Sequence, residues 1–179
     1  VLVYTPWGYD PEGKTEYPVA YLLHGMPLGD SSFVSWNKWK TLVPGVYPDL
    51  PPEGFQAWMD TLIAKGDIEP MIIVMPDAKS KYGFCFFTNS VLQGNYADFI
   101  AEDLVNYMDD NYKTIANRNG RAVIGHSQGG VGAINMGMYY PETFGTIGVL
   151  QSIPYFEGLF GGIPFVIADN PNGMNGPHA

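Results

Sequence analysis

Strand-length apolar runs, separated by segments with helical spacing, constrain the fold of this chain more than any other feature. The runs are almost continuously hydrophobic, as in strands that are buried on both faces of a sheet. There are six of them: VLVYT (1–5), VAYLLH (19–24), MIIVM (71–75), AVIGH (122–126), TIGVL (146–150) and PFVIA (164–168). Strands that alternate with helices predict an α/β fold, with a mostly parallel sheet and helices on both of its faces.

Three amphipathic helices are expected between these runs. The first ends at Gly66 and has its apolar residues at helical spacing, namely Phe55, Trp58, Met59, Leu62 and Ile63. Asn95 is the expected N-cap of the second helix, and Asp98 lies at the favourable end of its dipole. The third helix begins just after Ser127 and is ended by Pro141.

Two long segments, 26–54 and 76–94, are rich in Gly, Pro and aromatic residues and fit neither period. We expect them to be loops over a site at the carboxyl ends of the strands, where α/β sheets bind their ligands. A chain of 179 residues with 46% hydrophobic residues is large enough for one packed core. Without an internal repeat or linker, 1–179 is expected to form a single domain.

Charge and cysteine content exclude several classes of partner and site. The formal net charge is −9, with only 9 Lys and Arg residues, which argues against nucleic acid as a partner because phosphate binding needs clustered cations. The one cysteine, Cys85, excludes an internal disulfide and a cysteine-based zinc site. Its expected role is that of a small buried hydrophobic residue.

We expect no membrane-spanning segment in this chain. No window reaches the roughly 18 apolar residues of a membrane span, and no signal peptide opens the chain, so we expect a soluble protein with no membrane partner. The chain starts at Val1 inside a predicted strand, without an initiator methionine, and an upstream segment that includes any export signal is expected to be missing. The localisation stays unknown, with secreted and cytoplasmic locations both open.

The motif GHSQG at 125–129 matches the pattern Gly-x-Ser-x-Gly. It lies between a predicted buried strand and a predicted helix, which is the context of a nucleophile elbow. Glycines at the flanking positions allow the strand and helix to approach each other while the serine stays exposed. Ser127 is therefore the candidate nucleophile, and a structural serine or an inactivated site is the alternative.

Acyl transfer also needs hydrogen-bond donors for the oxyanion. The backbone N–H groups of Gln128, directly after the serine, and of Met26, in the loop after the strand 19–24, are the candidates. For the His24 side chain, a structural role is preferred to a catalytic one. His126 should point away from Ser127, since side chains alternate along a strand, and is therefore disfavoured as the base. Substrate contacts are expected from residues near these positions and in the aromatic loops: His24, Gly25, His126, Trp36 and Phe86.

Together these motifs resemble the esterase D and feruloyl-esterase-like serine hydrolases of the α/β-hydrolase superfamily, a group that includes acetylxylan esterases. The resemblance implies carboxylic ester hydrolysis, no metal or organic cofactor, and a catalytic Ser, Asp and His in that chain order. Gln128 departs from the methionine that this family often carries, a change that keeps the N–H donor. The resemblance covers about residues 1–152 and rests on YPVAYLLHG, IEPMIIVMPDA, FFTNSVLQGNYADFIAEDLVNYMDDNYKTI and NRNGRAVIGHSQGGVGAINMGMYYPETFG.

The acid and the base are expected after this region, in a shortened C-terminal part. Asp169 follows the run 164–168, where the superfamily places its acid, and His178 is the candidate base. Nine residues can span the distance back to Ser127 if that strand lies near the sheet centre. Either His178 returns over the sheet, or the chain has lost its native end. Asp77 is the substitute acid, although a turn is its expected role.

These residues predict a serine carboxylesterase that acts on short-chain acyl esters or on feruloyl or acetyl esters of carbohydrates. Sequence does not separate hydrolysis from transfer of the acyl group to another alcohol. The alternative is a non-catalytic α/β-hydrolase-like binding module that lacks a working base. An exposed sheet edge would then favour pairing between chains, so a homo-oligomer is allowed.

Overall fold

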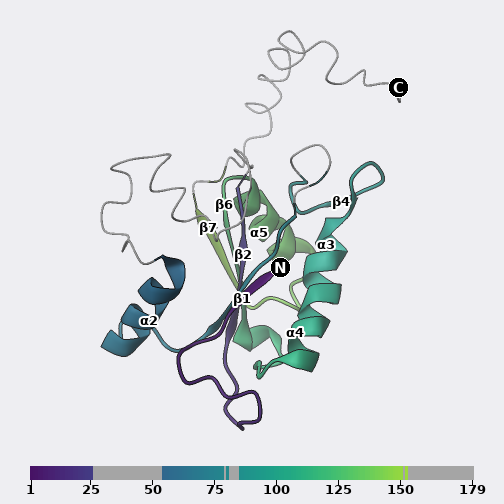
Figure 1. Ribbon diagram of the computed structural model, residues 1–179. Coiled ribbons are helices and arrows are strands. Elements are labelled where there is room, and N and C mark those ends of the chain that lie inside the picture. Colours follow the sequence, from purple (N-terminus) through teal and green to yellow (C-terminus); the bar gives the residue numbers. More distant parts are fainter. Residues whose placement is uncertain (26–53, 79, 81–84, 151, 153–179) are drawn as a thin grey trace, which may run out of the picture.

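The computed structural model describes residues 1–25, 54–78, 80, 85–150 and 152 (Figure 1). The predicted strand 164–168 and most of the predicted loop 26–54 lie outside these residues. Four candidate site residues also lie outside them: Met26, Trp36, Asp169 and His178.

A five-stranded sheet forms the centre of the described part, in the order β1-β3-β2-β6-β7. Strand β1 is antiparallel to β3, and the other neighbours are parallel, which confirms a mostly parallel sheet. Five of the six predicted runs form these strands. They are β1 (Leu2–Tyr4), β2 (Val19–Leu23), β3 (Ile72–Met75), β6 (Arg121–His126) and β7 (Thr146–Leu150).

Side chains on the inner strands alternate between two buried clusters. On β2, Val19, Tyr21 and Leu23 belong to the larger cluster, whereas Ala20 belongs to the smaller one. All four residues of β3 are buried, as its continuous hydrophobicity predicts. The same expectation is wrong for β7, where only Gly148 is even half-buried. Within the described sheet β7 is an edge strand that pairs with β6 only.

Helices cover both faces of the sheet, as predicted (Figure 1). Helix α2 (Phe55–Lys65) buries Met59 in the smaller cluster. The other helical segments pack into the larger cluster, and they are α3 (Tyr96–Asp98), the π-helix η2 (Phe99–Leu104), α4 (Val105–Asn111) and α5 (Gln128–Tyr139). A short 3-10 helix, η3 (Arg118–Gly120), leads into β6.

The C-terminus of α2 forms as its sequence predicts. Gly66 is in the left-handed conformation, with φ 74°, which a glycine adopts without steric cost. The N–H of Gly66 donates to the Ile63 carbonyl at 3.0 Å, and the N–H of Asp67 donates to the Leu62 carbonyl at 3.0 Å. These bonds satisfy two carbonyls that the end of the helix leaves unpaired.

The second helix starts after Asn95 as expected, but a different residue caps it. Asn95 makes no side-chain hydrogen bond to the helix. Instead, Asn89 Oδ1 accepts from the N–H groups of Ala97 (3.1 Å) and Asp98 (3.2 Å), and Asn89 Nδ2 donates to Asp98 Oδ1 at 2.7 Å. Asn89 reaches these groups from a hairpin of β4 (Asn89–Ser90) and β5 (Gly94–Asn95). Most of this hairpin lies in a segment expected to be an irregular loop.

Replacing Asn89 with alanine should therefore lower the free energy of unfolding by about 1 kcal/mol, the usual cost of a lost helix cap. Asn95→Ala should stay within about 0.5 kcal/mol of the wild type, because its side chain caps nothing. Urea unfolding of both variants measures the difference. A larger loss in Asn95→Ala than in Asn89→Ala would contradict this assignment of the cap.

Candidate active site

The carboxyl ends of three adjacent parallel strands meet at one edge of the sheet. His24 and Gly25 follow β2, Ser127 follows β6, and Ser152 lies just beyond β7. This is the edge at which the sequence places the site.

The Ser127 backbone adopts a conformation that is rare for a residue with a side chain. Its φ is 56° and its ψ is −118°, between the last residue of β6 and the first residue of α5. The Ser127 N–H donates to the Leu150 carbonyl at 3.1 Å, and the Ser127 carbonyl accepts from the Gly130 N–H at 3.0 Å. Such backbone conformations cost about 1–3 kcal/mol and collect at functional sites. The turn has the strand–serine–helix form expected of a nucleophile elbow.

Two glycines of the motif leave no room for a side chain. A Cβ atom on Gly125 would lie 1.9 Å from the Gly129 carbonyl oxygen, and one on Gly129 would lie 2.0 Å from the Leu23 carbonyl oxygen. The start of α5 therefore contacts the backbone of both β6 and β2 directly. This close approach explains why the motif requires glycine on either side of Ser127.

Gly25 brings the end of β2 next to Ser127. A Cβ atom on Gly25 would lie 3.3 Å from Ser127 Cβ and 3.2 Å from His126 Nδ1. The loop in which the oxyanion donor is expected thus begins beside the candidate nucleophile.

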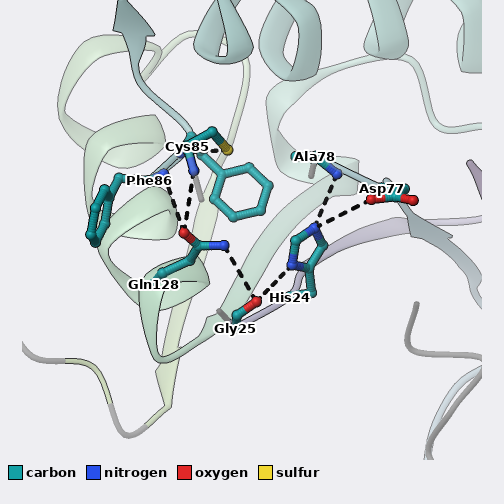
Figure 2. Close-up of polar contacts among 8 residues, drawn as sticks. His24, Gly25, Asp77, Ala78, Cys85, Phe86 and Gln128 are labelled. Atoms are coloured by element: carbon teal, nitrogen blue, oxygen red, sulfur yellow. Dashed lines mark hydrogen bonds and ion pairs between the residues drawn. The ribbon is translucent and has the colours of Figure 1, made fainter. Parts of the chain in front are cut away.

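The buried His24 ring is held by backbone groups at both nitrogens (Figure 2). Its Nε2 accepts from the Ala78 N–H at 3.0 Å, so the proton of the neutral ring is assigned to Nδ1, which donates to the Gly25 carbonyl at 2.8 Å. Asp77 Oδ1 is 4.0 Å from Nε2, beyond hydrogen-bond distance. The His24 ring also packs edge-on against Phe87, with centroids 5.4 Å apart.

The Gln128 side chain has hydrogen-bond partners that the sequence did not predict. This amide is 3% exposed, and its Nε2 donates to the Gly25 carbonyl at 3.3 Å. Its Oε1 accepts from the N–H groups of Cys85 and Phe86, each at 3.4 Å (Figure 2). Only the backbone N–H of Gln128 was expected to matter. The available signal was an amide in place of methionine within an otherwise apolar and glycine-rich run.

A second strained turn lies at the other end of this amide. Phe86 and Phe87 have φ values of 51° and 53°, in the left-handed region that residues with a side chain rarely adopt. Phe87 is fully buried, and Gly132 makes space for it, because a Cβ atom there would lie 2.8 Å from Phe87 Cβ. Phe86, a predicted substrate contact, is therefore placed in a turn bonded to Gln128.

The structure brings together Gly25, Ser127 and Gln128, with His24, His126 and Phe86 around them. His126 is half-buried at the end of β6. Asp77 lies beside His24, with its side chain 57% exposed. The base and acid predicted from sequence, His178 and Asp169, lie outside the described residues and stay predictions.

Cys85 is buried, and burial raises the pKa of its thiol to about 11, although a hydrogen bond from the Phe87 N–H acts in the opposite direction. At pH 8 only about a thousandth of such a thiol is the reactive thiolate, and the thiolate fraction rises only as pH approaches the pKa. We expect a disulfide reagent such as DTNB to modify native Cys85 at least about a hundredfold more slowly than the same protein unfolded in guanidinium chloride. Equal rates would show that the thiol is accessible.

The sequence matches a known protein family over most of its length. The family described as putative esterase matches residues 1–156. The chain belongs to this esterase family. Its resemblance to the esterase D and feruloyl-esterase-like group, inferred from the motifs, is confirmed at the level of the family.

Curated esterases are similar in sequence. This esterase-family chain is 33% identical over 164 residues to an endo-1,4-beta-xylanase/feruloyl esterase of Xylanibacter ruminicola, a match that covers 86% of this chain and 19% of that protein. It is 30% identical over 141 residues to an esterase of Mycobacterium tuberculosis, covering 78% of this chain and 26% of that protein. The chain thus spans about a fifth to a quarter of these two relatives.

Solved structures share the fold. A ferulic acid esterase superposes with a TM-score of 0.63 at 24% identity, covering 86% of this chain and 53% of that chain. A fluorophosphonate-binding serine hydrolase of Staphylococcus aureus superposes with a TM-score of 0.60 at 16% identity, covering 88% of this chain and 52% of that chain. The fold is therefore α/β-hydrolase-like, as predicted.

Among the residues that the structure describes, no group of three or more His, Cys, Asp and Glu side chains is arranged to hold a metal ion. Likewise, none of the helices in the described ranges is long and apolar enough to cross a bilayer.

Proposed function

We propose that this chain carries the nucleophile of a serine carboxylesterase, with Ser127 in that role. The observation that carries the proposal is the strained Ser127 turn, packed against Gly25 at the carboxyl ends of β2 and β6. A serine in an ordinary turn would need neither a positive φ nor flanking positions at which only glycine fits. The family match and the esterases among the relatives support the same chemistry.

The reaction proceeds in two steps. Ser127 Oγ attacks the ester carbonyl while a base takes its proton, and a tetrahedral oxyanion forms. The C–O bond to the alcohol then breaks, and the alcohol leaves with the proton from the base. Water repeats the sequence on the acyl-enzyme, which releases the carboxylic acid and restores the serine hydroxyl.

The remaining groups come from the sequence predictions. The backbone N–H of Gln128, at the first position of α5, is one oxyanion donor, and that of Met26 is the other. His178 is the proposed base and Asp169 its partner. No cofactor is required for this chemistry.

The proposed substrates are short-chain acyl esters and feruloyl or acetyl esters of carbohydrates. Support comes from the names of relatives: one is called a xylanase/feruloyl esterase, and one structural neighbour is a ferulic acid esterase in complex with ferulic acid. In this proposal Phe86 contacts the substrate from the turn that Gln128 holds. Trp36, outside the described residues, is proposed as a second aromatic contact.

Covalent labelling tests the proposal directly. Incubation of the purified protein with a fluorophosphonate should add one phosphonyl group, and peptide mass spectrometry should locate it on Ser127. The same preparation should hydrolyse p-nitrophenyl acetate and methyl ferulate, and prior labelling should abolish both rates. An unlabelled Ser127 in a folded protein would refute the proposal and favour a non-catalytic binding module, whose oligomeric state gel filtration would report.

A further inference from the structure

We propose that the Gln128 side chain is a positioning residue, which holds the Gly25 carbonyl and the Cys85–Phe86 backbone so that the oxyanion site keeps its shape. This inference rests on the proposed function, because it concerns the alignment of the same site. The positioning role belongs to the Gln128 side chain and is separate from that of the Gln128 backbone N–H, which is the proposed oxyanion donor.

The amide of Gln128 is buried and uses both of its ends. Burial of an amide costs free energy unless its hydrogen bonds are replaced inside the protein. Here Nε2 donates to the Gly25 carbonyl (3.3 Å), and Oε1 accepts from the N–H groups of Cys85 and Phe86 (3.4 Å each). One side chain therefore links three segments that are distant in sequence: the end of β2, the start of α5 and the turn at 85–87 (Figure 2).

The Gly25 carbonyl is held by two donors, Gln128 Nε2 and His24 Nδ1. A carbonyl oxygen has two lone pairs, so these donors use both and restrain the rotation of the peptide unit. The restraint matters because Gly25 lies beside Ser127. A Gly25 carbonyl that turned toward Ser127 would present its negative end to the oxyanion, and the two donors oppose such a rotation.

The other end of the amide meets a turn that needs support. Phe86 and Phe87 both have positive φ, and such residues persist only where their surroundings hold them. Gln128 Oε1 accepts from the N–H of Phe86 and from the N–H before it, while Phe87 packs on the His24 ring. These contacts form a ring. Gly25 bonds to Gln128, Gln128 bonds to the turn at 85–87, Phe87 of this turn packs on His24, and His24 bonds back to Gly25. Loss of the amide would therefore loosen the Gly25 carbonyl and the turn together.

Two substitutions separate the roles of the amide. Gln128→Met keeps the backbone N–H, a similar length and the residue common in the family, but it removes both hydrogen-bonding ends. Gln128→Glu keeps an acceptor for Cys85 and Phe86, and it can donate to the Gly25 carbonyl only when its carboxyl group is protonated. Ester hydrolysis by both variants and by the wild type should be measured between pH 5 and 8.

We expect Gln128→Met to lower kcat about ten- to hundredfold with KM within about twofold, since removal of a whole oxyanion donor costs about a hundred- to thousandfold. Gln128→Glu should be similarly slow at pH 8, and its rate relative to the wild type at the same pH should rise as pH falls. A Met variant with wild-type kcat, or a Glu variant with a constant ratio across pH, would overturn the inference.

Thermal unfolding at each pH excludes a general folding defect. The inference requires kcat to change at temperatures where the variants remain folded, and a rate that merely follows the folded fraction would overturn it. Hydrogen exchange of the peptide that contains Cys85 and Phe86 should be faster in Gln128→Met than in the wild type, and unchanged exchange would also overturn it. Ser127→Ala distinguishes failure of this inference from failure of the proposed function. If the wild type is no faster than this variant, the proposed function is wrong, and the positioning role that rests on it is wrong as well.

Discussion

Ser127→Ala should reduce kcat for p-nitrophenyl acetate about 10⁴- to 10⁶-fold, the range found when a serine nucleophile is removed and only binding and the oxyanion donors remain. Alanine retains the Cβ atom, so the strain at φ 56° is the same in both proteins and the thermal midpoint should barely change. Steady-state kinetics together with a thermal melt therefore separate loss of chemistry from loss of fold.

Ser152→Ala provides a matched control for this experiment. Its hydroxyl is close to the start of α5, since a Cβ atom on Gly130 would lie 2.9 Å from Ser152 Oγ. That hydroxyl is buried and makes no hydrogen bond in the described part of the chain, so alanine should be neutral or slightly stabilising. Hydrolysis should stay within about twofold of the wild type, as expected for a change that removes no stabilising interaction. A loss as large as that of Ser127→Ala would mean that the nucleophile is misassigned.

Gly129→Ala should destabilise the fold by at least about 4 kcal/mol, enough to unfold a typical domain in part. Helix propensity alone predicts the opposite sign, since alanine in a helix is favoured over glycine by about 1 kcal/mol. The new Cβ atom, however, would lie 2.0 Å from the Leu23 carbonyl oxygen, which belongs to a central strand and cannot rotate away. Urea unfolding, or the soluble yield if the variant does not fold, measures the effect.

Gly137→Ala is the same substitution on the same helix and serves as its control. Its Cβ atom would meet Ile147 Cγ2 at 2.9 Å, but that side chain is 47% exposed and can change rotamer. We expect a change of less than about 1 kcal/mol in either direction, because the helix propensity of alanine offsets the adjustment. Similar losses in both variants would show that contact with the β2 backbone is not what excludes a side chain from Gly129.

Local patterns in the sequence predicted the parts of the fold that depend on neighbouring residues. Continuous hydrophobicity located β2, β3 and β6, and helical spacing followed by Gly66 located α2 and its end. The strand–serine–helix order of the motif likewise predicted the turn at Ser127, because the steric requirement lies within a few residues. These features needed no knowledge of distant contacts.

Features that depend on distant residues could not be predicted in the same way. The cap of the second helix comes from Asn89 on a hairpin, whereas the adjacent Asn95 makes no side-chain hydrogen bond to the helix. The partners of the Gln128 amide come from Gly25 and from the turn at 85–87, which no periodicity connects. Exposure of β7 likewise depends on what lies beside it in the sheet.

The junction at Ser127 has a mechanical consequence. Strand β6 ends at His126 and helix α5 begins at Gln128, so a single residue connects them. A connection of one residue leaves the helix little freedom to move relative to the strand. Its two flanking glycines contact neighbouring backbone, and closely packed groups move together rather than separately. Ser127 is thus fixed in position relative to the sheet. In the proposed reaction, adjustment to esters of different shape therefore comes from the groups around Ser127.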